Sequence, residues 1–151
     1  LAECWLASSW PTLREMAKTA NKTLGWIEYK DFGLEAYGNG LTTTDKLIKE
    51  KPDLVRRFVK ATYKGYELLL KDPEGSADSV VKLFPTVKRQ IILEQIQEIN
   101  DLIVDKDARD KGLGWQSEAR MQKTADFINK AFKVEKPIAV ADTYTNQFLA
   151  N

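Results

Sequence analysis

The sequence predicts an α/β fold that is mostly helical and has few short strands. Apolar residues recur at three- and four-residue steps along several stretches, and prolines and capping residues stand before them. Only short aromatic and glycine-rich segments break this pattern. Because 151 residues with 43% hydrophobic content suffice for one core and are few for two, we expect residues 1–151 to form a single unit.

The strongest helical signal begins at Pro52, where a first turn tolerates proline and Asp53 complements the helix dipole. The apolar residues that follow predict one buried stripe, made of Leu54, Val55, Phe58, Val59, Thr62, Tyr66, Leu69 and Leu70. Asp72 and Pro73 repeat the start signal, so a second helix should follow at once and end at Pro85. Its inward residues are expected to be Ala77, Val80, Val81 and Phe84.

The first fifty residues give weaker signals. A short helix is expected after Pro11, and three threonines cap another over 45–50. The aromatic run 26–32 is β-prone, and short strands are expected there, at 34–37 and near Leu41. Three glycines allow the backbone to bend in this segment, namely Gly33, Gly38 and Gly40.

Two more helices are expected towards the C-terminus. Thr86 can cap a helix from Val87, with an inward face of Ile91, Ile92, Ile96, Ile99, Leu102 and Ile103. Ser117 opens the second, whose apolar face comprises Met121, Ala125, Ile128 and Phe132. Between them, residues 105–115 carry charges and two glycines without an apolar period, which predicts a loop or a helix stop.

Composition argues against several functions. The 23 basic and 22 acidic residues give a net charge of +1, so no global field favours nucleic acid. The chain has no histidine, which removes histidine bases and metal ligands, and we expect no catalytic residue, metal or cofactor. Cys4 cannot form an internal disulfide, and Asp105, Asp107 and Asp110 lack the glycine and glutamate of a calcium loop. No apolar run suits a bilayer, and no signal peptide is expected at Leu1.

The candidate ligand-binding residues combine stacking faces with short hydrogen-bonding groups on segments expected to be irregular; they are Trp5, Ser8, Ser9, Trp10, Asp31, Tyr37 and Asn39. Each has a structural alternative. The two tryptophans favour core packing, since large aromatic residues mostly serve burial. The two serines serve equally well as a helix cap. Asn39 suits a left-handed turn better than a ligand contact, and for Tyr37 both interpretations stay open.

A continuous pattern and a later motif also carry a resemblance. A Gly-Asn-Gly-Leu turn, a short helix, the run KPDLVRRFVKATYKGYELLLKDPEGSADSVVK and then GLGWQ before a helix resemble solute-binding proteins of bacterial ABC importers. The branch it resembles binds thiamine pyrimidine precursors, sulfonates, taurine or nitrate. The resemblance runs from about Asp31 to the end and does not identify the ligand.

This resemblance implies a periplasmic-binding-protein-like fold of type II, built of two lobes that close over a small polar or aromatic solute. The chain would be the C-terminal portion, with residues 1–41 in the lobe crossover and strands and 42–151 in the helical part. The N-terminal half would then be missing, which a start without Met supports. The family also implies a periplasmic location and an ABC permease as partner.

Two alternatives come from other classes of protein. Eukaryotic relatives of the same family make the thiamine pyrimidine, but their histidine- and cysteine-rich motifs are absent here. The other alternative is a stand-alone helical domain whose exposed apolar face binds a protein partner. The sequence also leaves open whether the chain forms a homodimer through such a face.

Overall fold

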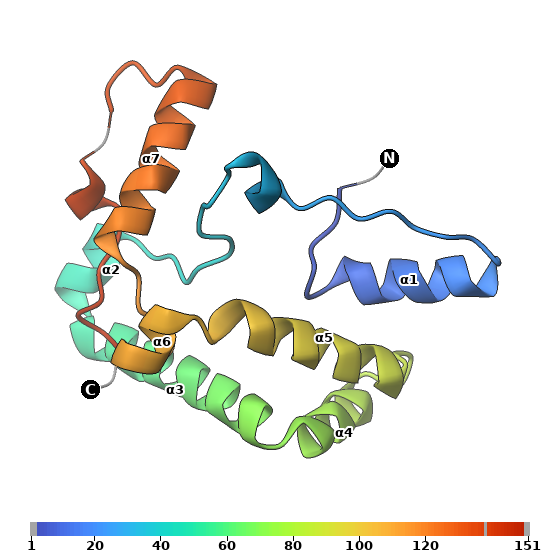
Figure 1. Cartoon of the computed structure of the whole chain (residues 1–151). Coiled ribbons are helices and arrows are strands. Elements are labelled where there is room, and N and C mark those ends of the chain that lie inside the picture. The colour runs from blue at the N-terminus through green and yellow to red at the C-terminus, as the bar shows by residue number, and fades with distance from the viewer. Residues whose placement is uncertain (1–2, 138, 150–151) are drawn as a thin grey trace. The chain divides into compact units, whose positions relative to one another are not determined.

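The computed structural model describes residues 3–137 and 139–149. Every regular element in this part of the chain is a helix (Figure 1): α1 (Ser9–Thr19), the 3-10 helix η1 (Tyr29–Phe32), α2 (Asp45–Glu50), α3 (Pro52–Lys71), α4 (Pro73–Leu83), α5 (Arg89–Ile103), α6 (Lys106–Lys111), α7 (Glu118–Phe132) and the 3-10 helix η2 (Val140–Asp142). The prediction of a mostly helical chain is therefore confirmed.

The prediction of strands at 26–32, 34–37 and near Leu41 is wrong, because the described residues contain no strand. A strand needs a neighbour to complete its hydrogen-bonded ladder, and the described chain offers none. The aromatic run instead closes a single 3-10 turn, which ends at Gly33 with a φ of +87°. A left-handed residue at this point favours glycine, so the turn signal was real although the strand was not.

The chain divides into two compact units. The first unit comprises residues 1–26 and 63–105, and the second comprises 27–62 and 106–151. Helix α3 continues from the second unit into the first, because the division falls within it. That residues 1–151 fold as a single unit stays a prediction, since compactness does not test folding cooperativity.

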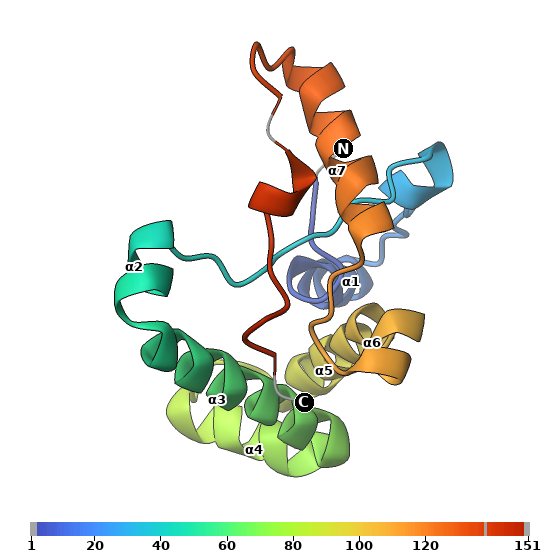
Figure 2. The same cartoon turned by 90° about the vertical axis from the view of Figure 1, so that its left-hand side faces the viewer.

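In the first unit, α4 and α5 lie side by side, and α1 packs against α5 (Figures 1 and 2). The buried centre consists of Pro11 from α1, Ala77 from α4 and Ile96 from α5. At the N-terminus of α5, the Lys88 ammonium donates to the carboxylate of Glu15 in α1 at 3.2 Å. Each of the three helices thus buries one apolar side chain, and α5 contacts both of the others.

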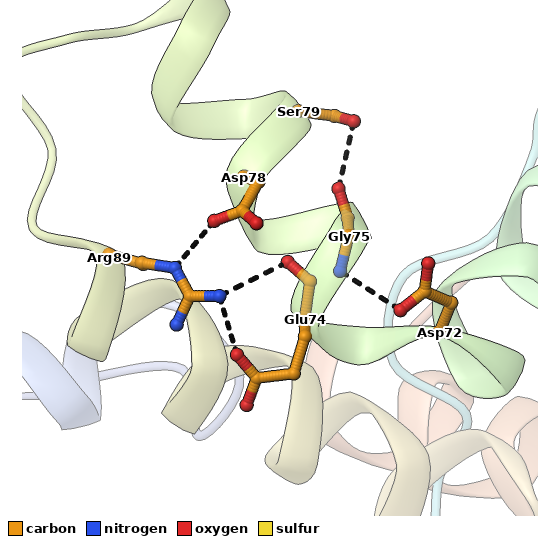
Figure 3. A network of polar contacts seen from close by, with 6 residues as sticks. All are labelled: Asp72, Glu74, Gly75, Asp78, Ser79 and Arg89. Atoms are coloured by element: carbon orange, nitrogen blue, oxygen red, sulfur yellow. Dashed lines mark hydrogen bonds and ion pairs between the residues drawn. The ribbon is translucent and has the colours of Figure 1, made fainter.

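Polar contacts also join these helices. Figure 3 shows that the Arg89 guanidinium of α5 donates to the carboxylates of Asp78 and Glu74 in α4, each at 2.5 Å. The hydrogen bond from Arg89 lowers the pKa of Asp78 below its usual value, and Asp78 with Glu74 raises the pKa of Arg89. Arg14 of α1 pairs with Glu94 of α5 and lowers the pKa of that carboxyl. These pairs are largely solvent-exposed, so they orient the helices and stabilise them only modestly.

The predicted start signals of α2, α3 and α4 are confirmed at the residues expected. The Thr44 hydroxyl accepts the Leu47 N–H at 3.2 Å, and the Asp72 carboxylate accepts the Gly75 N–H at 3.0 Å (Figure 3). A Cβ on Gly75 would lie 2.2 Å from Asp72 Oδ2. Glycine therefore leaves room for the cap that starts α4.

Two other helix starts differ from the prediction. Helix α1 begins at Ser9, so Pro11 lies inside its first turn instead of before the helix. Helix α5 begins at Arg89 with Lys88 at the N-cap position, so Thr86 is not its cap. Residues 84–87 form a turn that delays the helix.

The loop expected over residues 105–115 contains the six-residue helix α6. Its sequence has no apolar stripe, so hydrophobic periodicity could not reveal it. Asp107 and Lys111 stand four residues apart, an order that supports a solvated helix. Residues 112–115 of this stretch are irregular, as predicted, with Gly112 and Gly114 at positive φ.

Several residues predicted to face inward are exposed. On α3, Leu54 and Phe58 are 43% and 61% exposed, whereas Val55 between them is buried. Phe84 after α4 and Phe132 at the end of α7 are 60% and 72% exposed; Tyr66, Leu102 and Ile128 are also exposed. Spacing identified amphipathic helices, but it could not say which part of each apolar face finds a partner.

The second unit has a different construction. Helix α7 packs against η2, and the buried apolar side chains are Val55 of α3 and Phe148 of the C-terminal segment. The guanidinium carbon of Arg56 lies 5.7 Å from the centre of the Phe148 ring. The unit therefore relies on contacts between distant segments more than on stacked helices.

Candidate functional site

An open hollow of about 320 Å³ lies beside the start of α7 in the second unit. It is lined by Glu118, Ala141, Tyr144, Thr145 and Asn146. A carboxylate, a phenol and a hydroxyl thus converge on a space at the lower end of the range for small-molecule sites. Because it is open to solvent, the hollow suits one face of a ligand.

Asn146 fixes the wall of this hollow. Its side-chain Oδ1 accepts the Gln116 N–H at 3.0 Å, and its Nδ2 donates to the Gln116 carbonyl at 2.9 Å. One amide therefore pairs with both backbone groups of a residue 30 positions earlier. This reciprocal pair, which we call the Asn146 clasp, ties the C-terminal segment to the chain that enters α7.

Residues 34–37 also contact the first turns of α7. The Tyr37 phenol oxygen accepts the Ser117 N–H at 2.8 Å, and the Tyr37 N–H donates to Thr124 Oγ1 at 3.3 Å. The Arg120 guanidinium carbon lies 4.3 Å from the centre of the Tyr37 ring. Because Ser117 stands at the N-cap and makes no side-chain cap of its own, the phenol satisfies a backbone donor at the helix start.

Charge strengthens this attachment. Lys123 donates to the carboxylate of Glu35 at 2.5 Å, and this bond lowers the pKa of Glu35 below its usual value. Arg120 also donates to the Ala36 carbonyl at 3.5 Å. We call the set formed by Glu35, Tyr37, Ser117, Arg120, Lys123 and Thr124 the Tyr37 cluster. It holds the first turns of α7, while the Asn146 clasp holds Gln116, the residue before the N-cap.

The first unit holds a second open hollow, of about 310 Å³. Its lining residues are Glu15, Met16, Thr19, Ala20 and Lys88. Nearby in sequence, the rings of Trp10 and Trp26 have their centres 4.6 Å apart, tilted by 40°. Trp10 lies in the first turn of α1 and the hollow lies beside its last turns, so the two features occupy different parts of this helix.

The sequence pattern of the NMT1/THI5-like family matches residues 6–76 of this chain. Residues 6–76 are therefore similar to that family, over slightly less than half of the chain. The family match thus includes α1, both tryptophans of the stacked pair, Tyr37 and the proline-capped start of α4. It confirms the resemblance noted from the sequence.

One curated relative extends the comparison. The riboflavin-binding protein RibY of Chloroflexus aurantiacus is 25% identical over 118 residues, which cover 74% of this chain and 32% of the relative. The chain therefore spans about a third of the length of that protein. Among the described residues, no helix has the length and apolar character needed to cross a membrane.

The structure places the candidate ligand-binding residues in both units. Trp5, Ser8, Ser9 and Trp10 lie at the start of the first unit, and Asp31, Tyr37 and Asn39 lie in the second. Trp5 is 59% exposed, which does not suit the packing alternative, whereas Trp10 is half-buried against Trp26. None of the seven lines either hollow, and their contact with a ligand stays a prediction.

The serine and asparagine alternatives are only partly resolved. Ser8 occupies the N-cap position of α1 without a side-chain cap bond, and its carbonyl accepts Gln95 Nε2 at 2.7 Å. Asp31 and Asn39 are exposed. The left-handed turn expected at Asn39 is wrong, because Asn39 is not among the described residues with positive φ. The positions that sequence reasoning missed are Ser117, Arg120 and Asn146, which meet their partners 30 to 84 residues away. The polar composition of the GLGWQS and TNQF segments was a signal for Ser117 and Asn146, whereas Arg120 lies outside both segments.

Proposed function

We propose that this chain is part of the solute-binding component of an ABC importer, and that the solute is a small heteroaromatic molecule. The single observation that supports this is the match to a riboflavin-binding protein over 118 residues. The match of residues 6–76 to the NMT1/THI5-like family agrees with it. Among the solute classes implied by the resemblance, a ring system suits the exposed aromatic surface better than nitrate or a sulfonate does.

The chemistry of the described residues supports capture without catalysis. The hollow beside α7 offers a phenol, a hydroxyl and a carboxylate around an open space, which can orient a ligand through hydrogen bonds. Trp5 is 59% exposed and Trp26 is 37% exposed, so part of each indole side chain remains accessible to a ligand. The chain contains no histidine to act as a base.

The fuller picture belongs to the same proposal. The chain would form much of one lobe of a type II periplasmic binding fold, with the solute held in a cleft that a second lobe completes. The protein would work in the periplasm, and its closed form would dock on a membrane permease. These statements extend the family relationship from a chain that spans about a third of the relative's length.

Ligand titration tests the proposal. We would titrate the chain, and the complete polypeptide encoded by its gene, with riboflavin, an aminopyrimidine, taurine and nitrate, following tryptophan fluorescence and heat. Riboflavin or the aminopyrimidine should bind to the complete polypeptide, and the two anions should not. Selective binding of taurine or nitrate would contradict the heteroaromatic assignment, and binding of none of the four would contradict the proposed function.

Two substitutions would locate the site. Replacing Tyr144 in the hollow by alanine should weaken binding about tenfold if the hollow holds one face of the ligand. Trp5→Ala tests the sequence-based candidate in the same way. Tyr66→Ala on α3 is the matched control, since it removes an aromatic ring outside both hollows. Loss of affinity in the control would indicate general destabilisation.

A further inference from the structure

Helix α3 carries an exposed apolar row in addition to its partly covered face, on which Val55 is buried. The members of the exposed row follow one another at steps of four, three, four and three residues; they are Leu54, Phe58, Ala61, Gly65 and Leu68. All five are exposed, and the three large ones are between 43% and 61% exposed. Alternating steps of three and four are the repeat that lets one helix pack along another. We call this row the α3 seam.

A basic row runs along one edge of the α3 seam. Arg57, Lys64 and Lys71 are spaced by seven residues, so they recur at the same position of each heptad. All three are exposed, and within the described part of the chain no ion pair joins any of them to a carboxylate. The other edge consists of Val55, Thr62 and Leu69, which are covered or half-covered.

The glycine of the α3 seam supports a role in close packing. Gly65 lies inside a twenty-residue helix, where glycine is less favourable than alanine. A Cβ at Gly65 would meet nothing within 4 Å, so the chain's own packing does not require glycine there. Together with Ala61, it makes a shallow middle between the larger side chains of Phe58 and Leu68. A partner backbone can approach closely at such a point.

We propose that the α3 seam docks an amphipathic helix of a partner protein, whose acidic residues recur every seven positions and face Arg57, Lys64 and Lys71. The apolar residues of the α3 seam supply the hydrophobic contact. The basic row supplies the charge complementarity that selects an acidic partner. This docking surface is separate from the proposed solute site and does not depend on it.

Two other occupants fit the surface less well. In a second copy packed antiparallel, the two basic rows would face each other, and in a parallel copy each row would face Val55, Thr62 and Leu69. Neither arrangement pairs the cations. An anionic membrane would accept the charges, but Ala61 and Gly65 give the middle of the row nothing to insert. An acidic helix satisfies both the charges and the narrow apolar row.

Peptide binding tests this inference. The probe is a fluorescent synthetic helix of about three heptads, with leucine at the seam positions and glutamate at the positions facing the basic row. A second peptide has lysine in place of glutamate. Measured by anisotropy with the whole chain, the glutamate peptide should bind about tenfold more tightly than the lysine peptide. Equal binding of the two peptides, or binding of neither, would overturn the proposal.

Variants assign the effect to the α3 seam. The double change Arg57→Glu with Lys64→Glu should reverse the preference between the peptides, and Phe58→Ala should weaken the glutamate peptide about fivefold. Lys60→Glu is the matched control, because Lys60 is an exposed cation of the same helix on neither row. It should change the affinity by less than about twofold. Unchanged helical content by circular dichroism shows that each variant is folded.

Two further measurements separate the occupants. If light scattering shows a dimer that Phe58→Glu dissociates, the occupant is a second copy and the proposal is overturned. Sedimentation of the chain with phosphatidylserine vesicles, lost in the double charge variant, would overturn it in favour of a membrane. A monomer that stays in solution and binds only the acidic peptide supports it.

Discussion

The contacts that stabilise the first unit differ in kind from those that stabilise the second. In the first, helices that start at Pro73 and Arg89 stack on each other and are joined across a short turn by Arg89, Asp78 and Glu74. In the second, α7 is positioned by Tyr37, which lies 80 residues before Ser117 in the sequence. Local signals build the first unit, whereas the second depends on irregular segments that meet across the chain.

Removing a buried aromatic ring should change the free energy of unfolding most, and it should do so in one unit only. Phe148→Ala should destabilise the second unit by about 3 kcal/mol, because Phe148 is one of the two buried apolar side chains among that unit's described residues and its loss leaves a cavity. Ile96→Ala should cost the first unit about 2 kcal/mol. Urea unfolding combined with amide exchange would measure each loss. The exchange protection of α4 and α5 should survive Phe148→Ala.

The control for this pair is Phe132→Ala. Phe132 is 72% exposed, so its loss should change stability by less than about 0.5 kcal/mol. If Phe148→Ala instead removed protection from α4 and α5 together with α7, the two units would unfold as one. The difference between them would then be one of construction only, and the single-unit expectation from the sequence would be supported.

A smaller loss is expected at the Tyr37 cluster. Tyr37→Phe removes the acceptor of the Ser117 N–H and should destabilise the second unit by about 1 kcal/mol. Amide exchange at the start of α7 should rise while that of α5 stays unchanged. Tyr66→Phe serves as the control, since it removes a hydroxyl from an exposed ring on α3. Equal effects of the two variants would mean that the phenol does not hold α7.

The same contrast explains what could be predicted from the sequence. Thr44, Pro52 and Asp72 act on backbone groups within three residues, so α2, α3 and α4 were placed correctly. The expected strands failed because strands depend on partners that no local pattern reveals. Phe58 was expected to be buried and is exposed, because residue spacing identifies one face of a helix but not the segment that covers it. Tyr37 was a candidate, but its partners Ser117 and Arg120 carry no periodic signal.

The smallest expected effect is a change in how stability depends on pH. Folding lowers the pKa of Asp78, so its pair with Arg89 stabilises the first unit above the pH where the unfolded carboxyl titrates, near about 4. That contribution disappears as the pH falls through the lower, folded pKa. Arg89→Gln should therefore reduce the urea midpoint slightly at pH 7, and the reduction should become smaller as the pH falls to 2.

Lys82→Gln is the matched control, because it removes one exposed positive charge from α4. Its urea midpoint should follow that of the unchanged chain at every pH. If Arg89→Gln lowered the midpoint equally at pH 7 and pH 2, the role of Arg89 would be packing of its side chain, and the two units would differ less in their electrostatics.

The Asn146 clasp has a consequence for the chemical ageing of the protein. Deamidation would turn the amide of Asn146 into a carboxylate, which still accepts the Gln116 N–H but can no longer donate to the Gln116 carbonyl. Two like-polarity oxygens would then face each other where a hydrogen bond stood. A stored sample would lose one of the two bonds that tie its C-terminal segment to the entrance of α7, one molecule at a time, with a mass change of a single unit per event.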